Sequence, residues 1–300
     1  MEEYIGKVKL NLDFYKGTDA YSDGDIEEQL LETVKSGTDL EEFLTKENDW
    51  TFLYHFSKIR HNILEWYDFG EGKSLLEIGA GCGAISGLFC EKVDRVVAID
   101  LSKRRSSINA YRNQTHDNLE IIVGNFQDIE TDEKFDYVTL IGVLEYSIYY
   151  IGSEDPFHDM LRKAKSYLKP GGKLIIAIEN KYGIKYWAGA TEDHTGGFFD
   201  GIEGYDGVDR VRTFSRHGLE KLIKESGFTE TEFYYPVPDY KMPIEIYSEE
   251  RLPKRGSIKT QSPAYDRNRI ALFSETKALD SICEEGLFEE FANSFLVICG

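Results

Sequence analysis

One short segment, Lys73-Ser-Leu-Leu-Glu-Ile-Gly-Ala-Gly-Cys-Gly-Ala84, has the pattern of a strand, a glycine-rich turn and the start of a helix. Its first part, Ser74 to Ile78, is an apolar run between glycines, which is typical of a buried strand. The residues from Ala84 to Lys92 continue as a predicted helix. Glycines let a ligand approach the backbone closely, and the first turn of a helix offers unpaired N–H groups. The segment therefore predicts a nucleotide site in an α/β fold.

Glu77 distinguishes between two classes of nucleotide ligand. Gly79 and Gly81, followed by Ala84, also satisfy a relaxed dinucleotide pattern. However, Glu77 precedes the first of these glycines by two residues, at a position expected to face the ligand crevice. A carboxylate there would repel a pyrophosphate, whereas it suits a ligand that carries an ammonium and a sulfonium group. We therefore favour a cationic ligand and keep a nicotinamide dinucleotide as the alternative.

The ends of the next two predicted strands carry residues that suit a nucleoside. Asp100 ends the strand that begins at Arg95, about twenty residues after the first glycine, where a carboxylate accepts hydrogen bonds from ribose hydroxyls. Its alternative role is to cap the helix that starts near Ser102. Asn125 and Phe126 end the third strand, where an amide can recognise adenine and a ring can stack on it.

Two residues elsewhere complete the predicted nucleotide site. Gly142 follows the fourth strand and permits close approach of a ligand. Arg60 belongs to a predicted helix from Thr51 to Trp66, and its guanidinium binds either a ligand carboxylate or a salt-bridge partner. The predicted cofactor-binding residues are Glu77, Gly79, Gly81, Gly83, Asp100, Leu101, Asn125, Phe126, Gly142 and Arg60.

The composition is that of a globular chain with a strong excess of acidic residues. There are 35 basic and 54 acidic residues, which give a formal charge of −19. Such a field opposes duplex DNA, structured RNA and anionic membrane surfaces, so we expect no nucleic-acid partner. No apolar run is long enough to span a bilayer, and the N-terminus lacks a signal-peptide pattern. The four cysteines are widely scattered and form no zinc-binding pattern, so we expect no metal site. They also fit a reducing compartment better than a disulfide framework, so we expect a cytoplasmic protein.

The order of the motifs resembles that of class I S-adenosylmethionine-dependent methyltransferases. The glycine turn, the acidic end of the second strand, Asn-Phe, the Phe-Asp strand and Lys-Pro-Gly-Gly follow one another between Gly72 and Asn180. The resemblance implies a Rossmann-like α/β sheet of seven strands with the last one antiparallel, S-adenosylmethionine at its carboxyl edge, and transfer of the methyl group. It also implies a helix from Ser215 to Gly227 and closing strands at Thr229 to Pro236 and Ser294 to Gly300.

The spacing of apolar residues, together with the order of the motifs, predicts how the chain is divided into domains. Residues 1–70 are expected to form a helical N-terminal cap, with one helix from Ser22 to Lys35, a further one near Leu40 to Thr45, and the helix that contains Arg60. Residues 71–300 form the methyltransferase domain, with insertions at 180–212 and 239–293. Loops of that length in a compact domain usually carry function.

A general base for the reaction is expected in the first insertion. Methyl transfer from a sulfonium is an in-line displacement, so the protein mainly aligns the reactants and, for a hydroxyl acceptor, takes a proton. His194 has a near-neutral unperturbed pKa and is the predicted base. Asp193 either orients it or acts directly. The alternative is that the histidine of this loop makes only a structural hydrogen bond.

The acceptor class is less constrained than the donor. The loop from Asn180 to Tyr205 and the Pro238-Asp-Tyr240 stretch are similar to those of bacterial methyltransferases found beside glycosyltransferases in surface-polysaccharide pathways, which implies a sugar hydroxyl. We therefore predict a small-molecule or carbohydrate acceptor, methylated on oxygen. The alternatives are an amine or protein side chain as acceptor, a NAD-dependent oxidoreductase, and a catalytically silent module that binds the donor.

Overall fold

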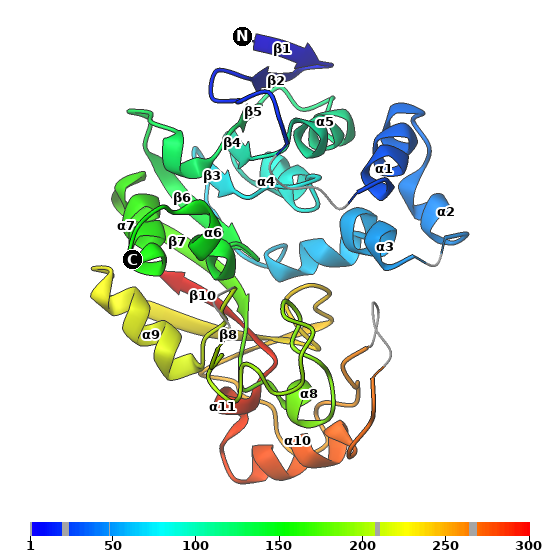
Figure 1. Cartoon of the computed structure of the whole chain (residues 1–300), viewed down its shortest axis with the longest axis vertical. Coiled ribbons are helices and arrows are strands. Elements are labelled where there is room, and N and C mark those ends of the chain that lie inside the picture. The colour runs from blue at the N-terminus through cyan, green and yellow to red at the C-terminus, as the bar shows by residue number, and fades with distance from the viewer. Residues whose placement is uncertain (1, 20–23, 48, 208–210, 264–268) are drawn as a thin grey trace. The chain divides into compact units, whose positions relative to one another are not determined.

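The computed structural model describes residues 2–19, 24–47, 49–207, 211–263 and 269–300 (Figure 1). Ser22, where the first predicted helix begins, lies outside these ranges. The chain separates into two compact units. The first comprises Met1–Leu140 and Tyr167–Leu174, and the second comprises Ile141–Ser166 and Ile175–Gly300.

The first unit is built on a mostly parallel sheet. Its strands are β1 (Glu2–Ile5), β2 (Val8–Asn11), β3 (Ser74–Ile78), β4 (Arg95–Asp100), β5 (Leu119–Val123) and β6 (Phe135–Ile141). They lie in the order β1-β2-β5-β4-β3-β6. All neighbouring pairs are parallel except the antiparallel hairpin of β1 and β2. Because β3 and β4 are parallel neighbours, Glu77 and Asp100 come to the same edge of the sheet.

Sequence pattern explains the central strands. Every residue of β3, and all of β4 after Arg95, is buried, as expected for parallel strands covered on both faces. The helices that follow them are α4 (Ser86–Lys92) and α5 (Lys103–Arg112). The predicted boundaries of both strands are confirmed, and α4 begins two residues later than expected.

The N-terminal helices pack on the same unit. They are α1 (Ile26–Lys35), α2 (Leu40–Leu44), α3 (Trp50–Phe56) and the 3-10 helix η1 (Lys58–Ile63). Their buried apolar side chains form one cluster with the glycine turn and α5, made by Leu30, Leu31, Val34, Phe52, Phe56, Cys82 and Ile108. The single helix expected from Thr51 to Trp66 was wrong, because Ser57 adopts an extended conformation (ψ 130°) and caps η1 with its hydroxyl.

The second unit contains an antiparallel part of the sheet, formed around β8. It contains the end of β7 (Leu168–Glu179), and β8 (Thr231–Val237), β9 (Glu245–Ser248) and β10 (Ser294–Cys299), in the order β7-β10-β8-β9. Strand β8 pairs antiparallel with both β10 and β9. The helices of this unit are α6 (Ser147–Tyr150), α7 (Pro156–Ser166), α8 (Ile184–Trp187), α9 (Arg216–Glu225), α10 (Glu275–Glu284), α11 (Phe288–Phe291) and the 3-10 helix η3 (Leu144–Tyr146).

The expected α/β class with an antiparallel last strand is confirmed, with differences in detail. The described residues hold ten strands instead of seven, because the N-terminal hairpin β1-β2 and the short β9 extend the core set. The Lys-Pro-Gly-Gly motif, Lys169 to Gly172, lies within β7, and its Gly171 has a positive φ of 77°. Among the described helices, none has the length and apolar character needed to cross a membrane. The domain boundary at residue 70 stays a prediction.

Candidate functional site

The glycine turn follows β3 and is fixed by hydrogen bonds to the neighbouring strand. The backbone N–H of Gly79 donates to the carbonyl oxygen of Ile99 (2.9 Å). Gly79, Gly81 and Gly83 all have positive φ angles, of 71°, 54° and 73°. A Cβ atom on Gly83 would lie 2.3 Å from the side-chain oxygen of Asn109, so this position requires glycine for both conformation and space.

Asp100 ties this turn to the start of α5. Its carboxylate accepts hydrogen bonds from the backbone N–H groups of Gly81 (2.8 Å) and Ser102 (2.9 Å). The N-cap of α5 is Ser102, whose hydroxyl accepts from the N–H of Arg105 (3.2 Å), so Asp100 does not have the capping role considered as its alternative. The ribose contact of Asp100 stays a prediction.

Glu77 is buried at the end of β3 and faces α4. Its carboxylate accepts a hydrogen bond from the hydroxyl of Ser86 (2.5 Å), which in turn accepts from the side-chain amide of Asn109 (2.9 Å). Burial, together with the nearby charge of Asp100, raises the pKa of Glu77 to about 8. Its carboxyl group therefore holds a proton at neutral pH in the absence of a cationic partner.

The N-terminal helices contact the turn through Arg112. Its guanidinium donates to the carbonyl oxygens of His55 (2.6 Å) and Cys82 (2.9 Å), and burial lowers the pKa of Arg112 to about 10. Burial also raises the pKa of Cys82 to about 11, consistent with its place in the apolar cluster. Arg60 is buried as well, with its guanidinium 4.0 Å from the centre of the Tyr54 ring.

The residues after β4 and β5 occupy neighbouring positions in the first unit. Leu101 is half-buried directly after Asp100. The side-chain oxygen of Asn125 accepts from the N–H of Gln127 (3.0 Å) and caps the 3-10 helix η2 (Phe126–Asp128). Phe126 is buried against the ring of Tyr167, with 5.7 Å between ring centres. The adenine contacts expected of Asn125 and Phe126 stay predictions.

Gly142 belongs to the second unit. It has a φ of 69°, and its N–H donates to the carbonyl oxygen of Ala177 (2.9 Å). A Cβ atom there would lie 2.9 Å from the Tyr240 hydroxyl. The glycine is therefore explained by packing within this unit, and a role in binding the cofactor stays a prediction.

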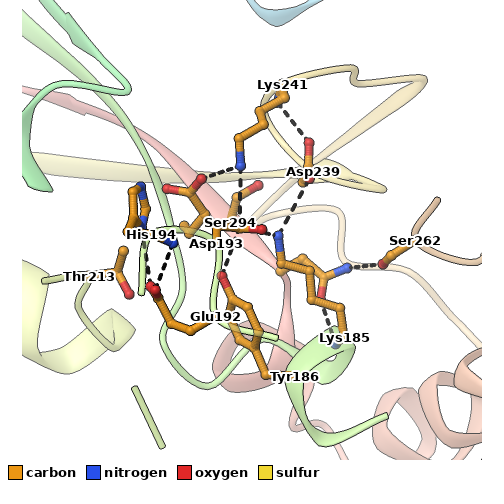
Figure 2. Close-up of polar contacts among 12 residues, drawn as sticks. Lys185, Tyr186, Glu192, Asp193, His194, Thr213, Asp239, Lys241, Ser262 and Ser294 are labelled. Atoms are coloured by element: carbon orange, nitrogen blue, oxygen red, sulfur yellow. Dashed lines mark hydrogen bonds and ion pairs between the residues drawn. The ribbon is translucent and has the colours of Figure 1, made fainter. Parts of the chain in front are cut away.

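Asp193 anchors the loop that follows α8. Its carboxylate contacts the ammonium of Lys185 (2.6 Å), the hydroxyl of Tyr186 (2.9 Å) and the ammonium of Lys241 (3.3 Å), as Figure 2 shows. Burial alone would raise the pKa of Asp193, but the two lysines hold it well below its usual value. An anion so strongly paired is a poor proton acceptor. The geometry therefore favours an anchoring role for Asp193.

His194 lies among three buried carboxylates. Its Nδ1 is 3.1 Å from Glu192 Oε1, and its Nε2 is 3.8 Å from Glu145 Oε1 (Figure 2 shows the first contact). Burial lowers the pKa of His194, but the charges of Glu179, Glu192 and Glu145 outweigh it and raise the pKa to about 9. Burial and the neighbouring Glu179 raise the pKa of Glu145 to about 8. This cluster therefore holds a histidine and two glutamates, Glu145 and Glu192, within 3.8 Å of its ring nitrogens.

The sequence predicted roles for Asp193 and His194 in this group but gave none to the adjacent Glu192, to Glu145 or to Glu179. The available signal was the one that identified Asp100, since Glu179 is the last residue of β7 and Glu145 follows β6 in η3. Acidic residues at the carboxyl ends of parallel strands meet at one sheet edge. Glu192 had no such signal, because it lies in a loop.

A parallel sheet with a glycine turn after a central strand and a carboxylate at the end of the next strand is typical of nucleotide-binding α/β proteins. A model of the family described as "Methyltransferase domain" matches residues 52–232, more than half of the chain. The chain belongs to this methyltransferase family. This match confirms the methyltransferase family that the motif order predicted, with S-adenosylmethionine as the expected methyl donor, and gives no support to the oxidoreductase alternative. The turn is compatible with this cofactor, because a Cβ atom at Gly81 or Gly83 would lie 3.1 Å from Arg105 or 2.3 Å from Asn109, and glycine at both positions leaves the backbone N–H groups without side chains of their own beside them.

Individual relatives differ in their acceptors. "Protein arginine N-methyltransferase 6" of Danio rerio is 28% identical over 59% of this chain and 45% of that protein. "Ubiquinone biosynthesis O-methyltransferase, mitochondrial" of Dictyostelium discoideum is 28% identical over 39% of this chain and 38% of that protein. A solved Thermotoga maritima structure, described as a possible histamine N-methyltransferase, has a TM-score of 0.47 and 16% identity over 87% of this chain and 96% of that chain. The chain spans less than half the length of these two curated relatives.

The first test concerns the contact between the turn and Asp100. Asp100→Ala removes the acceptor of two backbone N–H groups, so we expect S-adenosylmethionine binding to weaken by about 1.5–3 kcal/mol in calorimetry. Asp100→Asn, which keeps one acceptor oxygen, serves as the matched control and should lose less. Unchanged affinity in the alanine variant would show that the carboxylate does not support the donor site.

The second test concerns the burial of Glu77. Because its pKa in the folded protein lies above the unfolded value, the folded state binds more protons between about pH 4.5 and 8. The stability of the unliganded protein should therefore fall as pH rises through this window. Glu77→Gln stays neutral and retains an acceptor for Ser86, so at pH 8.5 it should be more stable than the wild type by roughly 1–4 kcal/mol.

Urea denaturation of both proteins at pH 5 and pH 8.5 measures this difference. The two proteins should be nearly equal at pH 5, where the wild-type carboxyl is protonated in the folded state. A difference that is the same at both pH values would contradict the assignment of the effect to ionisation of Glu77.

Proposed function

We propose that this methyltransferase transfers the methyl group of S-adenosylmethionine to a hydroxyl oxygen of a small polar acceptor, either a small molecule or a sugar. The observation that carries the proposal is the state of Glu145 in the second unit. This side chain is 1% exposed, and within the described residues neither carboxylate oxygen has a hydrogen-bond partner. A buried carboxyl group in that state is suited to hydrogen-bond an acceptor hydroxyl, and it can take the hydroxyl proton in its ionised form, whose share grows as the pH rises toward its raised pKa of about 8.

The neighbours of Glu145 support this use. The Nε2 atom of His194 lies 3.8 Å from its Oε1, and Glu192 contacts the other ring nitrogen of the histidine. A proton acceptor beside an imidazole that a third group orients is a recurring arrangement for removing a hydroxyl proton. An alcohol must lose its proton as the oxygen–methyl bond forms, so such a group assists the reaction directly.

The loop that carries His194 is built to hold this group in place. The buried Lys185 and the half-buried Lys241 both pair with Asp193, the residue next to His194. Glu192 also accepts from the backbone N–H groups of His194 (2.7 Å) and Thr195 (2.6 Å). Several buried, charge-assisted contacts therefore fix the histidine, as a positioned group requires.

A second candidate is methylation of an amine or of a protein side chain. The carboxylates of Glu145 and Glu179 lie close together, and the whole chain carries a formal charge of −19, so a cationic acceptor would be attracted. The Danio rerio relative is an arginine N-methyltransferase by name. An amine that reacts in its neutral form needs less assistance from a base, which separates the two candidates experimentally.

The third test uses Glu145→Gln with labelled S-adenosylmethionine and separate pools of polyols and sugars, phenols, amines and peptides. For a hydroxyl acceptor, turnover should fall by about 10²–10⁴, the usual contribution of a positioned proton acceptor, while donor affinity stays unchanged. Glu203→Gln changes an exposed glutamate of the loop that carries His194; it is the matched control and should retain full turnover. Label transferred only to amines or peptides would contradict the proposal.

A further inference from the structure

Three ligand-type side chains converge in the second unit. They are Glu145 in η3, Glu179 at the end of β7 and His194 in the loop after α8. Each offers one atom, and these atoms all lie within 4.8 Å of one another. The residues come from separate segments of the chain, which is why no sequence spacing revealed them and the sequence predicted no metal site.

Two of the three side chains have buried atoms that call for a partner. Both oxygens of Glu145 and the Oε2 atom of Glu179 have no hydrogen-bond partner among the residues the structure describes. Glu145 is 1% exposed and Glu179 is fully buried. Burying carboxylate oxygens without a hydrogen-bond partner costs free energy. The proximity of these oxygens therefore indicates a bound group that supplies the missing polar contacts.

Outer contacts orient two of these ligands, His194 and Glu179. The Nδ1 atom of His194 lies 3.1 Å from Glu192 Oε1; when it carries the proton and donates there, Nε2 is left with its lone pair on the side of Glu145. The ammonium of Lys241 and the hydroxyl of Tyr240 contact Glu179 Oε1, which leaves Oε2 available. Carboxylate partners behind a histidine ligand and hydrogen bonds to a ligating carboxylate are typical of metal sites.

The charges around the cluster favour a cation. Ion pairs around the cluster involve five carboxylates and two ammonium groups, and the two sets of pairs meet where Glu145, Glu179 and His194 lie together. The carboxylates belong to Glu145, Glu179, Glu192, Asp193 and Asp239, and the ammonium groups to Lys185 and Lys241. A net negative charge remains when His194 is neutral, and a divalent cation would offset most of it.

We propose that Glu145, Glu179 and His194 bind one divalent metal ion. Two carboxylate oxygens and one imidazole nitrogen form a mixed set that suits Mn²⁺, because carboxylates favour Mg²⁺ and Mn²⁺ while imidazole favours transition metals. Three protein ligands leave further coordination positions open, as in metal sites that bind a substrate oxygen. Glu145 can ligate through one oxygen and keep the other for an acceptor hydroxyl.

The ion would deepen the proposed function without being required by it. A hydroxyl oxygen bound to a divalent cation is oriented, and its proton is lost more easily. Binding of the ion itself depends only on the three ligands and is measured without donor or acceptor. Failure of the metal site therefore leaves hydroxyl methylation testable, and the reverse also holds.

The experiment removes metals from the full-length protein with a chelator and titrates it with Mn²⁺ alone, followed by electron paramagnetic resonance. We expect one ion per chain, and binding weakened at least tenfold in both Glu145→Gln and Glu179→Gln. Glu203→Gln should bind as tightly as the wild type. Circular dichroism of each variant checks that it is folded.

A measurement on the wild type avoids any effect of substitution on folding. Mn²⁺ is paramagnetic, so it should broaden the imidazole resonances of His194 well before those of the exposed His217 in α9 of the same unit, and Mg²⁺ in excess should reverse this. Absence of binding at millimolar Mn²⁺, or binding that the two glutamine variants do not weaken, would overturn the proposal. So would selective binding of methylammonium at this cluster with no effect of Mn²⁺, which would identify a protonated amine as its ligand.

Discussion

The conformation of the turn between β3 and α4 is the constraint on which the first unit depends. Three glycines with positive φ bring the backbone close to α5, and the Asp100 carboxylate fixes it by accepting from Gly81 and Ser102. The N-terminal helices reinforce the arrangement, because Arg112 joins His55 to Cys82 and the apolar cluster includes Cys82. The backbone conformation of this predicted donor site thus depends on packing from segments that are distant in sequence.

The first unit was predictable where local pattern determines structure. Strands β3 and β4 matched because buried parallel strands are apolar runs, and Asp100 was identified because a strand end and a glycine turn have a fixed spacing. The hairpin β1-β2 was missed because its two strands have four residues each and contain charges. Its strand conformation depends on pairing with β5, which is a tertiary effect.

The ionisable cluster of the second unit could not be predicted from local sequence pattern. His194 was singled out by residue type and loop position, but its environment is determined by residues from β7, η3 and the strand-to-strand connection that carries Lys241. Sequence spacing cannot report such convergence. Nor could it show that Asp193, one residue away, is neutralised by two lysines while both oxygens of Glu145 lack a hydrogen-bond partner in the described structure. Neighbours in sequence therefore have different chemical roles here.

The central claim is that the turn selects a sulfonium nucleoside over a dinucleotide. Isothermal titration of the wild-type protein with S-adenosylmethionine, with its demethylated product and with NAD, under identical conditions, tests it most directly. We expect both members of the S-adenosyl pair to bind with dissociation constants on the order of micromolar, about −8 kcal/mol, and NAD to bind much more weakly. NAD affinity equal to that of S-adenosylmethionine would contradict the account.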